Sequence, residues 1–164
     1  MSTLQVPVSP PAPLPSEVTH QSLGALIDDA GERYAGQLFW ESIDDGFSMS
    51  FEQFASASRQ FANALKDRGV EPGMHVAVMM PNSIAYALAW IAVSRLGAVT
   101  VPINANYTAH EIAYVLENSD ASYLLIDTDF EHMLADVGAV VGTLRKVFTL
   151  ATRPGAVPTW QDFV

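Results

Sequence analysis

The chain has 164 residues, of which 49% are hydrophobic and 16% charged, and its formal net charge is −10. Binding of nucleic acid needs clustered Lys and Arg, so this acidic balance argues against such a partner. The absence of cysteine excludes disulfides, thiolate metal sites and a cysteine nucleophile. No basic residue precedes Arg33, and the longest apolar run, Ile84–Val93, has 10 residues. We therefore expect neither a secretory signal nor a transmembrane segment, and a cytoplasmic location by elimination.

The first part of the chain divides into an arm, a helix and a hairpin. Residues 1–18 hold five of the ten prolines, and we expect a flexible, extended arm because proline lacks the backbone donor of helices and central strands. Thr19 to Tyr34 is predicted to form a short amphipathic helix. Leu38–Ile43 and Phe47–Met49 then pair as a hairpin around Asp44-Asp45-Gly46. The helix is expected to turn four apolar side chains to one face: Leu23, Leu26, Ile27 and Ala30.

Three capping boxes mark the starts of later helices. In a capping box, a Ser or Thr side chain and a Glu or Gln three residues on satisfy each other's free backbone N–H groups. The boxes are Ser50-Phe-Glu-Gln53, Thr108-Ala-His-Glu111 and Thr128-Asp-Phe-Glu131. They predict helices near 51–66, 109–117 and 129–137. The first of these is expected to end at Gly69, in the left-handed conformation that glycine adopts at helix ends.

Apolar strands are predicted to alternate with the helices. The strands lie near 75–80, 98–101, 122–126 and 146–150. A further helix over 83–96 is apolar nearly all round, so we expect it to be buried. This alternation predicts an α/β fold, with a mostly parallel sheet flanked by helices and joined by right-handed crossovers. Residues 19–150 are expected to form this α/β unit, and 151–164, which lack periodicity, to be irregular.

The residues themselves indicate no catalytic, cofactor-binding or metal-binding site. The glycines have neither of the common phosphate-loop spacings. The carboxylate pairs Asp28-Asp29 and Asp44-Asp45 are assigned to the polar side of a helix and to a turn. No serine lies in a hydrolase frame, and the histidines lack metal-ligand spacing. The four histidines, expected to have structural or solvent-facing roles, are His20, His75, His110 and His132.

Four further segments follow one another along the chain: Ser48-Met-Ser-Phe-Glu-Gln-Phe54, Phe61–Gly73, Val76–Ser83 and Leu96-Gly-Ala-Val-Thr-Val-Pro-Ile-Asn104. In this order and at this spacing they resemble the adenylate-forming enzymes, which include acyl-CoA synthetases and peptide-synthetase adenylation domains. The segment Leu96–Asn104 is the most specific of the four. Asn104 and the Thr108-x-x-Glu111 pattern look more like acyl- and aryl-CoA synthetases than adenylation domains. The resemblance covers Ser48 to Asp127, and it implies the N-terminal subdomain of the adenylate-forming fold.

The resemblance also implies a reaction for the parent enzyme. A carboxylic acid reacts with ATP to give an acyl-adenylate and pyrophosphate, and the thiol of CoA then displaces AMP. ATP, Mg²⁺ and CoA are thus implied for the parent. The phosphate loop, the ribose-binding aspartate and the C-terminal lysine of the family are missing from these residues, so no site residue is carried over. We expect the chain to lack the remainder of the ligase and to be inactive alone.

Two other interpretations stay open. The chain could be an autonomous α/β binding or regulatory module that shares only the fold, or a structural domain of a larger assembly. A receiver-like module fits poorly, because Asp127 follows a strand but the early strand ends in Met80-Pro81. If a partner subdomain is missing, the apolar helix 83–96 is expected to leave an exposed apolar face that drives self-association.

Overall fold

The computed structural model describes residues 22–43, 46–152 and 159–164. A parallel sheet of four strands has the order β4-β3-β5-β6. The strands are β3 (His75–Met79), β4 (Val99–Pro102), β5 (Ala121–Asp127) and β6 (Lys146–Leu150). This confirms the predicted α/β fold with a parallel sheet and the positions of its strands to within about two residues. The predicted arm 1–18 and turn residues Asp44-Asp45 lie outside the described residues.

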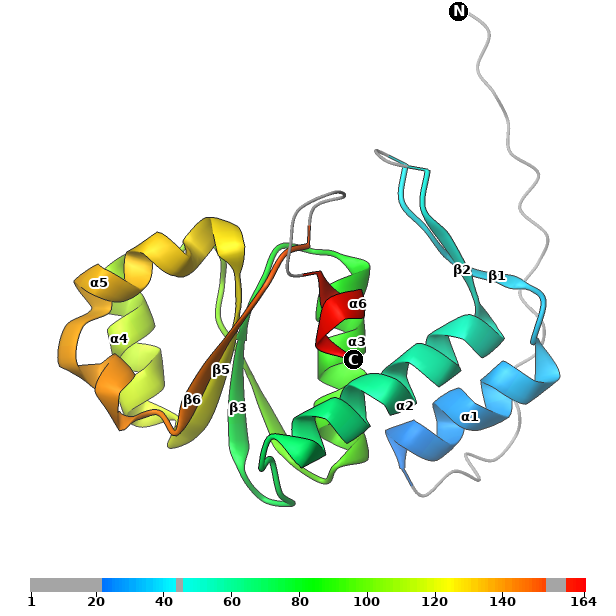
Figure 1. The fold of residues 1–164 in the computed structure, drawn as a ribbon, viewed down its shortest axis with the longest axis horizontal. Coiled ribbons are helices and arrows are strands. Elements are labelled where there is room, and N and C mark those ends of the chain that lie inside the picture. Colours follow the sequence, from blue (N-terminus) through cyan, green and yellow to red (C-terminus); the bar gives the residue numbers. More distant parts are fainter. Residues whose placement is uncertain (1–21, 44–45, 153–158) are drawn as a thin grey trace, which may run out of the picture.

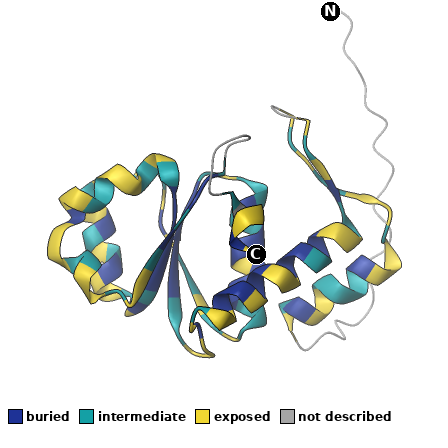
Figure 2. Cartoon of the chain, viewed as in Figure 1, coloured by how far each residue is buried: buried dark blue, intermediate teal, exposed yellow. Residues whose placement is uncertain are grey.

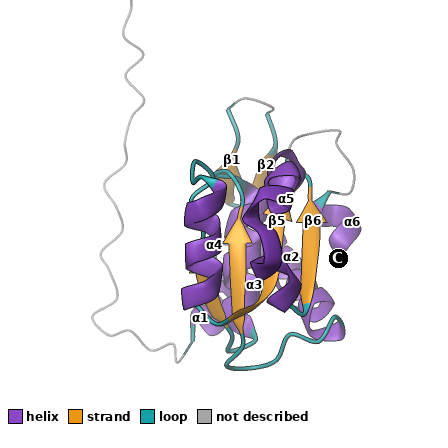
Figure 3. Ribbon diagram, turned by 90° about the vertical axis from the view of Figure 1, so that its left-hand side faces the viewer, coloured by secondary structure: helices purple, strands orange, loops and turns teal. Residues whose placement is uncertain are grey.

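Helices cover both faces of this sheet (Figure 1). On one side lie α2 (Phe51–Asp67), α3 (Ile84–Arg95) and the short α6 (Trp160–Phe163). On the other lie α4 (Ala109–Asn118) and α5 (Leu134–Val137), the latter flanked by the 3-10 helices η1 (Thr128–Met133) and η2 (Gly138–Thr143). Figure 3 shows the strands running side by side between the two helix layers.

Helix α1 (Leu23–Arg33) and the antiparallel hairpin of β1 (Leu38–Glu41) and β2 (Ser48–Ser50), the first elements of the chain, lie on the α2 side of the sheet. Helix α1 packs on α2, and the hairpin follows it, as the sequence predicts. The hairpin projects from the start of α2, away from the four-stranded sheet (Figure 1). Among the described residues, no helix combines the length and apolarity needed to span a bilayer.

The central strand β3 is buried on both faces, and its alternating side chains enter two separate cores. Val76 and Val78 pack into the larger core, together with α2, α3 and α6, and Ala77 and Met79 pack into the smaller one under α4. All four are fully buried, and Figure 2 shows buried residues along the sheet and on α2 and α3. Pro102 is tolerated in β4 because that strand lies at the edge of the sheet, where a ladder donor can be lost.

Local signals fix the ends of most helices. The capping boxes at Ser50 and Thr108 form as predicted. Gly69 has a φ of +93° after the end of α2, which confirms the predicted left-handed stop. The Glu111 carboxylate accepts hydrogen bonds from the backbone N–H and the hydroxyl of Thr108. Both bonds lower the pKa of this carboxyl, and the backbone bond has the larger effect.

Three predictions about the helices are wrong in detail. The predicted α-helix over 129–137 is mostly 3-10 helix, with only Leu134–Val137 in α conformation. The capping box at Thr128 does not form, because the carboxylate of Asp127, one residue earlier, caps this turn through the Asp129 N–H. In α1, Leu26 was expected on the buried face but is 42% exposed, and the fully buried positions are Gly24 and Gly31.

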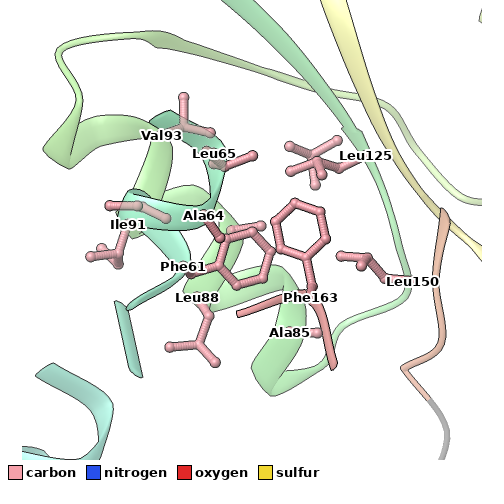
Figure 4. Close-up of a cluster of buried hydrophobic side chains, with 14 of the residues drawn as sticks. Phe61, Ala64, Leu65, Ala85, Leu88, Ile91, Val93, Leu125, Leu150 and Phe163 are labelled. Carbon is pink, nitrogen blue, oxygen red and sulfur yellow. The ribbon is translucent and has the colours of Figure 1, made fainter. Parts of the chain in front are cut away.

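The segment after β6 is also more regular than expected. We expected 151–164 to be irregular, but Thr159 caps the short helix α6 with a box of its own. This turn places Phe163 in the larger core, with ring centroids 4.9 Å from Phe61 and 5.4 Å from Phe148 (Figure 4). The Arg68 guanidinium lies 4.2 Å from the Phe163 ring centroid. A buried aromatic side chain thus attaches the last residues to the sheet.

Replacing Phe163 with alanine is expected to lower the free energy of unfolding by about 3 kcal/mol, because a cavity opens beside Phe61 and Phe148. Urea denaturation followed by circular dichroism measures this change. Gln161→Ala, an exposed position on the same helix, serves as the control and is expected to change stability by less than about 0.5 kcal/mol. Equal effects of the two substitutions would show that α6 does not pack as described.

Candidate functional site

The strand order singles out one edge of the sheet. After β3 the chain crosses to β4 on one side, and then to β5 on the other side of β3. Such a reversal leaves a crevice outside the carboxyl ends of the two central strands, which is where open α/β sheets bind ligands. In this chain that position is between the segment after β3, Met80–Ser83, and the end of β5 at Asp127.

Asp127 is the buried charged residue of this edge, with 0% of its surface exposed. One carboxylate oxygen accepts the backbone N–H of Asp129 at 2.8 Å. The other accepts the backbone N–H of Thr152 at 2.8 Å and also its hydroxyl. These donors offset the cost of burying the charge, since a buried carboxylate needs hydrogen bonds or a counter-charge. Asp127 therefore fastens the end of β5 to the chain that leaves β6.

The neighbouring segments at this edge form turns and helix caps. The Ser83 hydroxyl accepts the Tyr86 N–H and starts α3. The Asn104 side chain accepts the N–H of Asn106, which tightens the turn between β4 and α4. These side chains hold the backbone and carry neither a nucleophile–base pair nor an acid–base pair.

The described residues do not fit ATP or Mg²⁺ as a resident group. They contain no group of three or more His, Cys, Asp or Glu side chains able to hold a metal ion. Asp127, the buried carboxylate within the described ranges, already accepts three hydrogen bonds, and the glycines have no phosphate-loop spacing. No catalytic, cofactor-binding or metal-binding residue is therefore assigned within the described part of the chain.

Two surface hollows lie along α2. One, of about 310 Å³, lies between β2, α2 and α6, and its lining includes Gln53, Gln60 and Gln161. The other, of about 370 Å³, lies between α1 and α2, and its lining includes Asp28 and Arg59. The described lining of the first hollow includes no ionisable side chain, whereas the second also has Glu32 and Glu52 in its lining, and its Asp28 is paired with arginines.

The residues considered from sequence have the following places. His75 lies at the start of β3, where its Nδ1–H donates to the Ser119 carbonyl oxygen at 2.5 Å. His110 and His132 are exposed, whereas His20 lies outside the described residues. Asp28 was predicted to lie on the polar side of its helix. The structure shows in addition that its carboxylate contacts two arginines from other helices. Sequence reasoning missed this cluster and the role of Asp127, although an aspartate ending an apolar strand was a usable signal.

Comparison with known proteins identifies the family of this chain. A family model described as AMP-binding enzyme matches residues 27–159. The chain belongs to this family. It is 35% identical over 156 residues to the long-chain-fatty-acid–CoA ligase of Salmonella typhimurium, covering 90% of this chain and 28% of the relative. It is 34% identical over 131 residues to the corresponding ligase of Escherichia coli O6:H1, covering 77% of this chain and 23% of that relative.

Solved structures agree on the family fold. A long-chain-fatty-acid-CoA ligase from Archaeoglobus fulgidus superposes with a TM-score of 0.76 at 27% identity, over 87% of this chain and 29% of that one. An anthranilate CoA ligase solved with anthranoyl-AMP gives a TM-score of 0.75 at 21% identity, over 87% of this chain and 26% of that one. The second likeness shows the fold alone. The member described here thus spans about a quarter of the length of its ligase relatives and corresponds to their N-terminal part.

Asp127→Asn is expected to lower the free energy of unfolding by about 2 kcal/mol, because the amide NH₂ group meets hydrogen-bond donors where the carboxylate accepted them. Urea denaturation monitored by fluorescence measures the loss. Asp136→Asn, at an exposed position of α5, removes the same charge and is expected to change stability by less than about 0.5 kcal/mol. A matching loss in both variants would contradict the assigned role of Asp127.

Proposed function

We propose that this chain forms the N-terminal part of an AMP-forming acid–thiol ligase. The parent enzyme converts ATP, a carboxylic acid and CoA into acyl-CoA, AMP and pyrophosphate through an acyl-adenylate. The observation that carries the proposal is 35% identity to a long-chain-fatty-acid–CoA ligase across 90% of this chain. Fatty acids are therefore the first substrates to test. The cytoplasmic location expected from the sequence stays a prediction.

The part played by these residues is that of a scaffold. The four-stranded sheet offers its carboxyl edge, where Asp127 ties β5 to the exit of β6. We infer that the groups that bind ATP, Mg²⁺ and CoA belong to the remaining part of the ligase; for ATP and Mg²⁺ this is supported by the lack of phosphate-loop spacing and of a metal-ligating group among the described residues. Without donors preorganised around the phosphates, the electrostatic stabilisation on which such reactions depend is absent.

The chain 1–164 alone is expected to give no carboxylate-dependent exchange of labelled pyrophosphate into ATP above background. In a chimera, these residues replace the matching N-terminal part of the Salmonella ligase, and fatty-acid-dependent exchange is expected to return. The control chimera carries Leu88→Asp, which places a charge in the larger core and is expected to abolish exchange. Exchange by the chain alone would show that the active site was misplaced. An inactive but folded chimera would favour the autonomous α/β module.

We further propose that the isolated chain self-associates through the outer face of α3. This face carries Tyr86, Ala87 and Trp90, and Trp90 is 51% exposed. From Ile84 to Ser94 the helix has no charged residue, so two copies of an acidic chain can approach here without bringing charges of α3 together. A second copy is therefore the occupant that we assign to this face when the rest of the ligase is absent.

Trp90→Glu is expected to weaken this association at least about tenfold, because it places a charge at the centre of the apolar face. Sedimentation equilibrium over a range of concentrations measures the dissociation constant. Tyr114→Glu changes another exposed aromatic residue, on α4, and is expected to leave the constant unchanged. A monomer at all concentrations for the unaltered chain would rule out self-association.

A further inference from the structure

Helix α1 is attached to the molecule differently from its neighbours. Its fully buried positions are two glycines, Gly24 and Gly31, which contribute almost no apolar area. Leu23 and Ile27 are partly buried, and Leu26 is exposed. By contrast, α2 and α3 bury large side chains at many positions of the larger core. Apolar burial therefore stabilises the docking of α1 less than that of α2 or α3.

The glycines let α1 approach closely. A Cβ atom at Gly31 would lie 2.8 Å from the Cβ of Ala55 on α2. A Cβ atom at Gly24 would lie 3.0 Å from the Cγ of Arg95, at the end of α3. This approach brings the next turn of α1, with Asp28, within reach of side chains from both partner helices.

Asp28 joins the three helices through charged hydrogen bonds. Its carboxylate accepts Nη1 and Nη2 of Arg95 at 2.9 and 2.7 Å, and Nη1 of Arg59 at 2.6 Å. Arg95 also donates its Nε–H to the hydroxyl of buried Ser58, at 3.0 Å. The side chain of Arg95 is 10% exposed, that of Asp28 37% and that of Arg59 51%. The two-pronged contact with Arg95 is therefore the strongest of the set and the least screened, whereas Arg59 adds little.

We propose that α1 is a clasp, held on α2 and α3 chiefly by the contact of Asp28 with Arg95, and that it opens as a unit while the four-stranded sheet stays folded. Opening of this kind is local unfolding, whose free energy is lower than that of global unfolding. High salt opens the clasp at neutral pH, because it screens the ion pair. The apolar cores are insensitive to that screening.

Acid is the second factor that opens the clasp. The hydrogen bond from Arg95 lowers the pKa of Asp28, while burial opposes the shift. A lowered folded-state pKa means that the stabilisation is present above the ordinary value of about 3.9 and is lost as the pH falls through the lower one. The other titratable groups at this place, Glu32 of α1 and Glu52 of α2, line the hollow beside Asp28 and Arg59.

Hydrogen exchange of the whole chain, read by mass spectrometry, tests the clasp. Arg95→Met and Asp28→Asn are each expected to lower the protection of α1 amides about tenfold, while the amides of β3 and β5 keep theirs. Raising sodium chloride from about 0.05 to about 1 M, which shortens the screening length to about 3 Å, is expected to lower α1 protection in the unaltered chain. The same change of salt is expected to have little effect in Arg95→Met.

Asp29→Asn is the matched control. Asp29 lies next to Asp28 and pairs with exposed Arg33 of the same helix, so the variant loses a carboxylate without touching Arg95. It is expected to leave α1 protection within about twofold, as surface ion pairs contribute little. Unchanged protection in Arg95→Met, an equal loss in Asp29→Asn, or an equal loss in α1 and the sheet would each overturn the proposal. The salt series on the unaltered chain decides the question if a variant fails to fold.

Discussion

The burial of β3 on both faces is the constraint on which the rest of this structure depends. Its alternating side chains enter two cores, so helices must cover the sheet on both sides. Parallel neighbours need crossover connections, and these connections are the helices that provide the cover. The same helices thus serve as crossovers between parallel strands and cover both faces of the central strand β3. The reversal of direction at β3, which marks the position where open α/β sheets bind ligands, follows from the strand order.

Polar contacts between residues far apart in the sequence hold two parts of the structure in place: the segment after β6 and helix α1. Asp127 holds the end of β5 to Thr152, 25 residues later. Asp28 holds α1 to Arg95, 67 residues later. In both places a carboxylate accepts several donors, and this compensates for its removal from water. The structure therefore combines two apolar cores with two charged fastenings, one at the edge of the sheet and one at the outer helix.

The family match and the chemistry of the described residues lead to one consistent view. The chain belongs to the AMP-binding enzymes and spans about a quarter of the length of its ligase relatives. Its resemblance segments are structural: they form strands, turns and helix caps. The segment Leu96–Asn104, for example, begins at the C-cap of α3 and contains the whole of β4 and the start of the turn that Asn104 tightens. In the described structure, the side chains of this stretch thus shape the backbone, as Asn104 does in its turn.

The sequence alone determined the alternation of strands and helices and most of their ends. Capping boxes, glycine stops and apolar runs are short-range signals, and they work wherever nearby residues complete the interaction, as at Ser50 and Gly69. Only the tertiary structure decided the strand order, the contacts of Asp28 and Asp127, and the burial of Phe163. The physical reason is that these features depend on groups far apart in the chain. Their approach is set by the packing of whole elements, which no local pattern records.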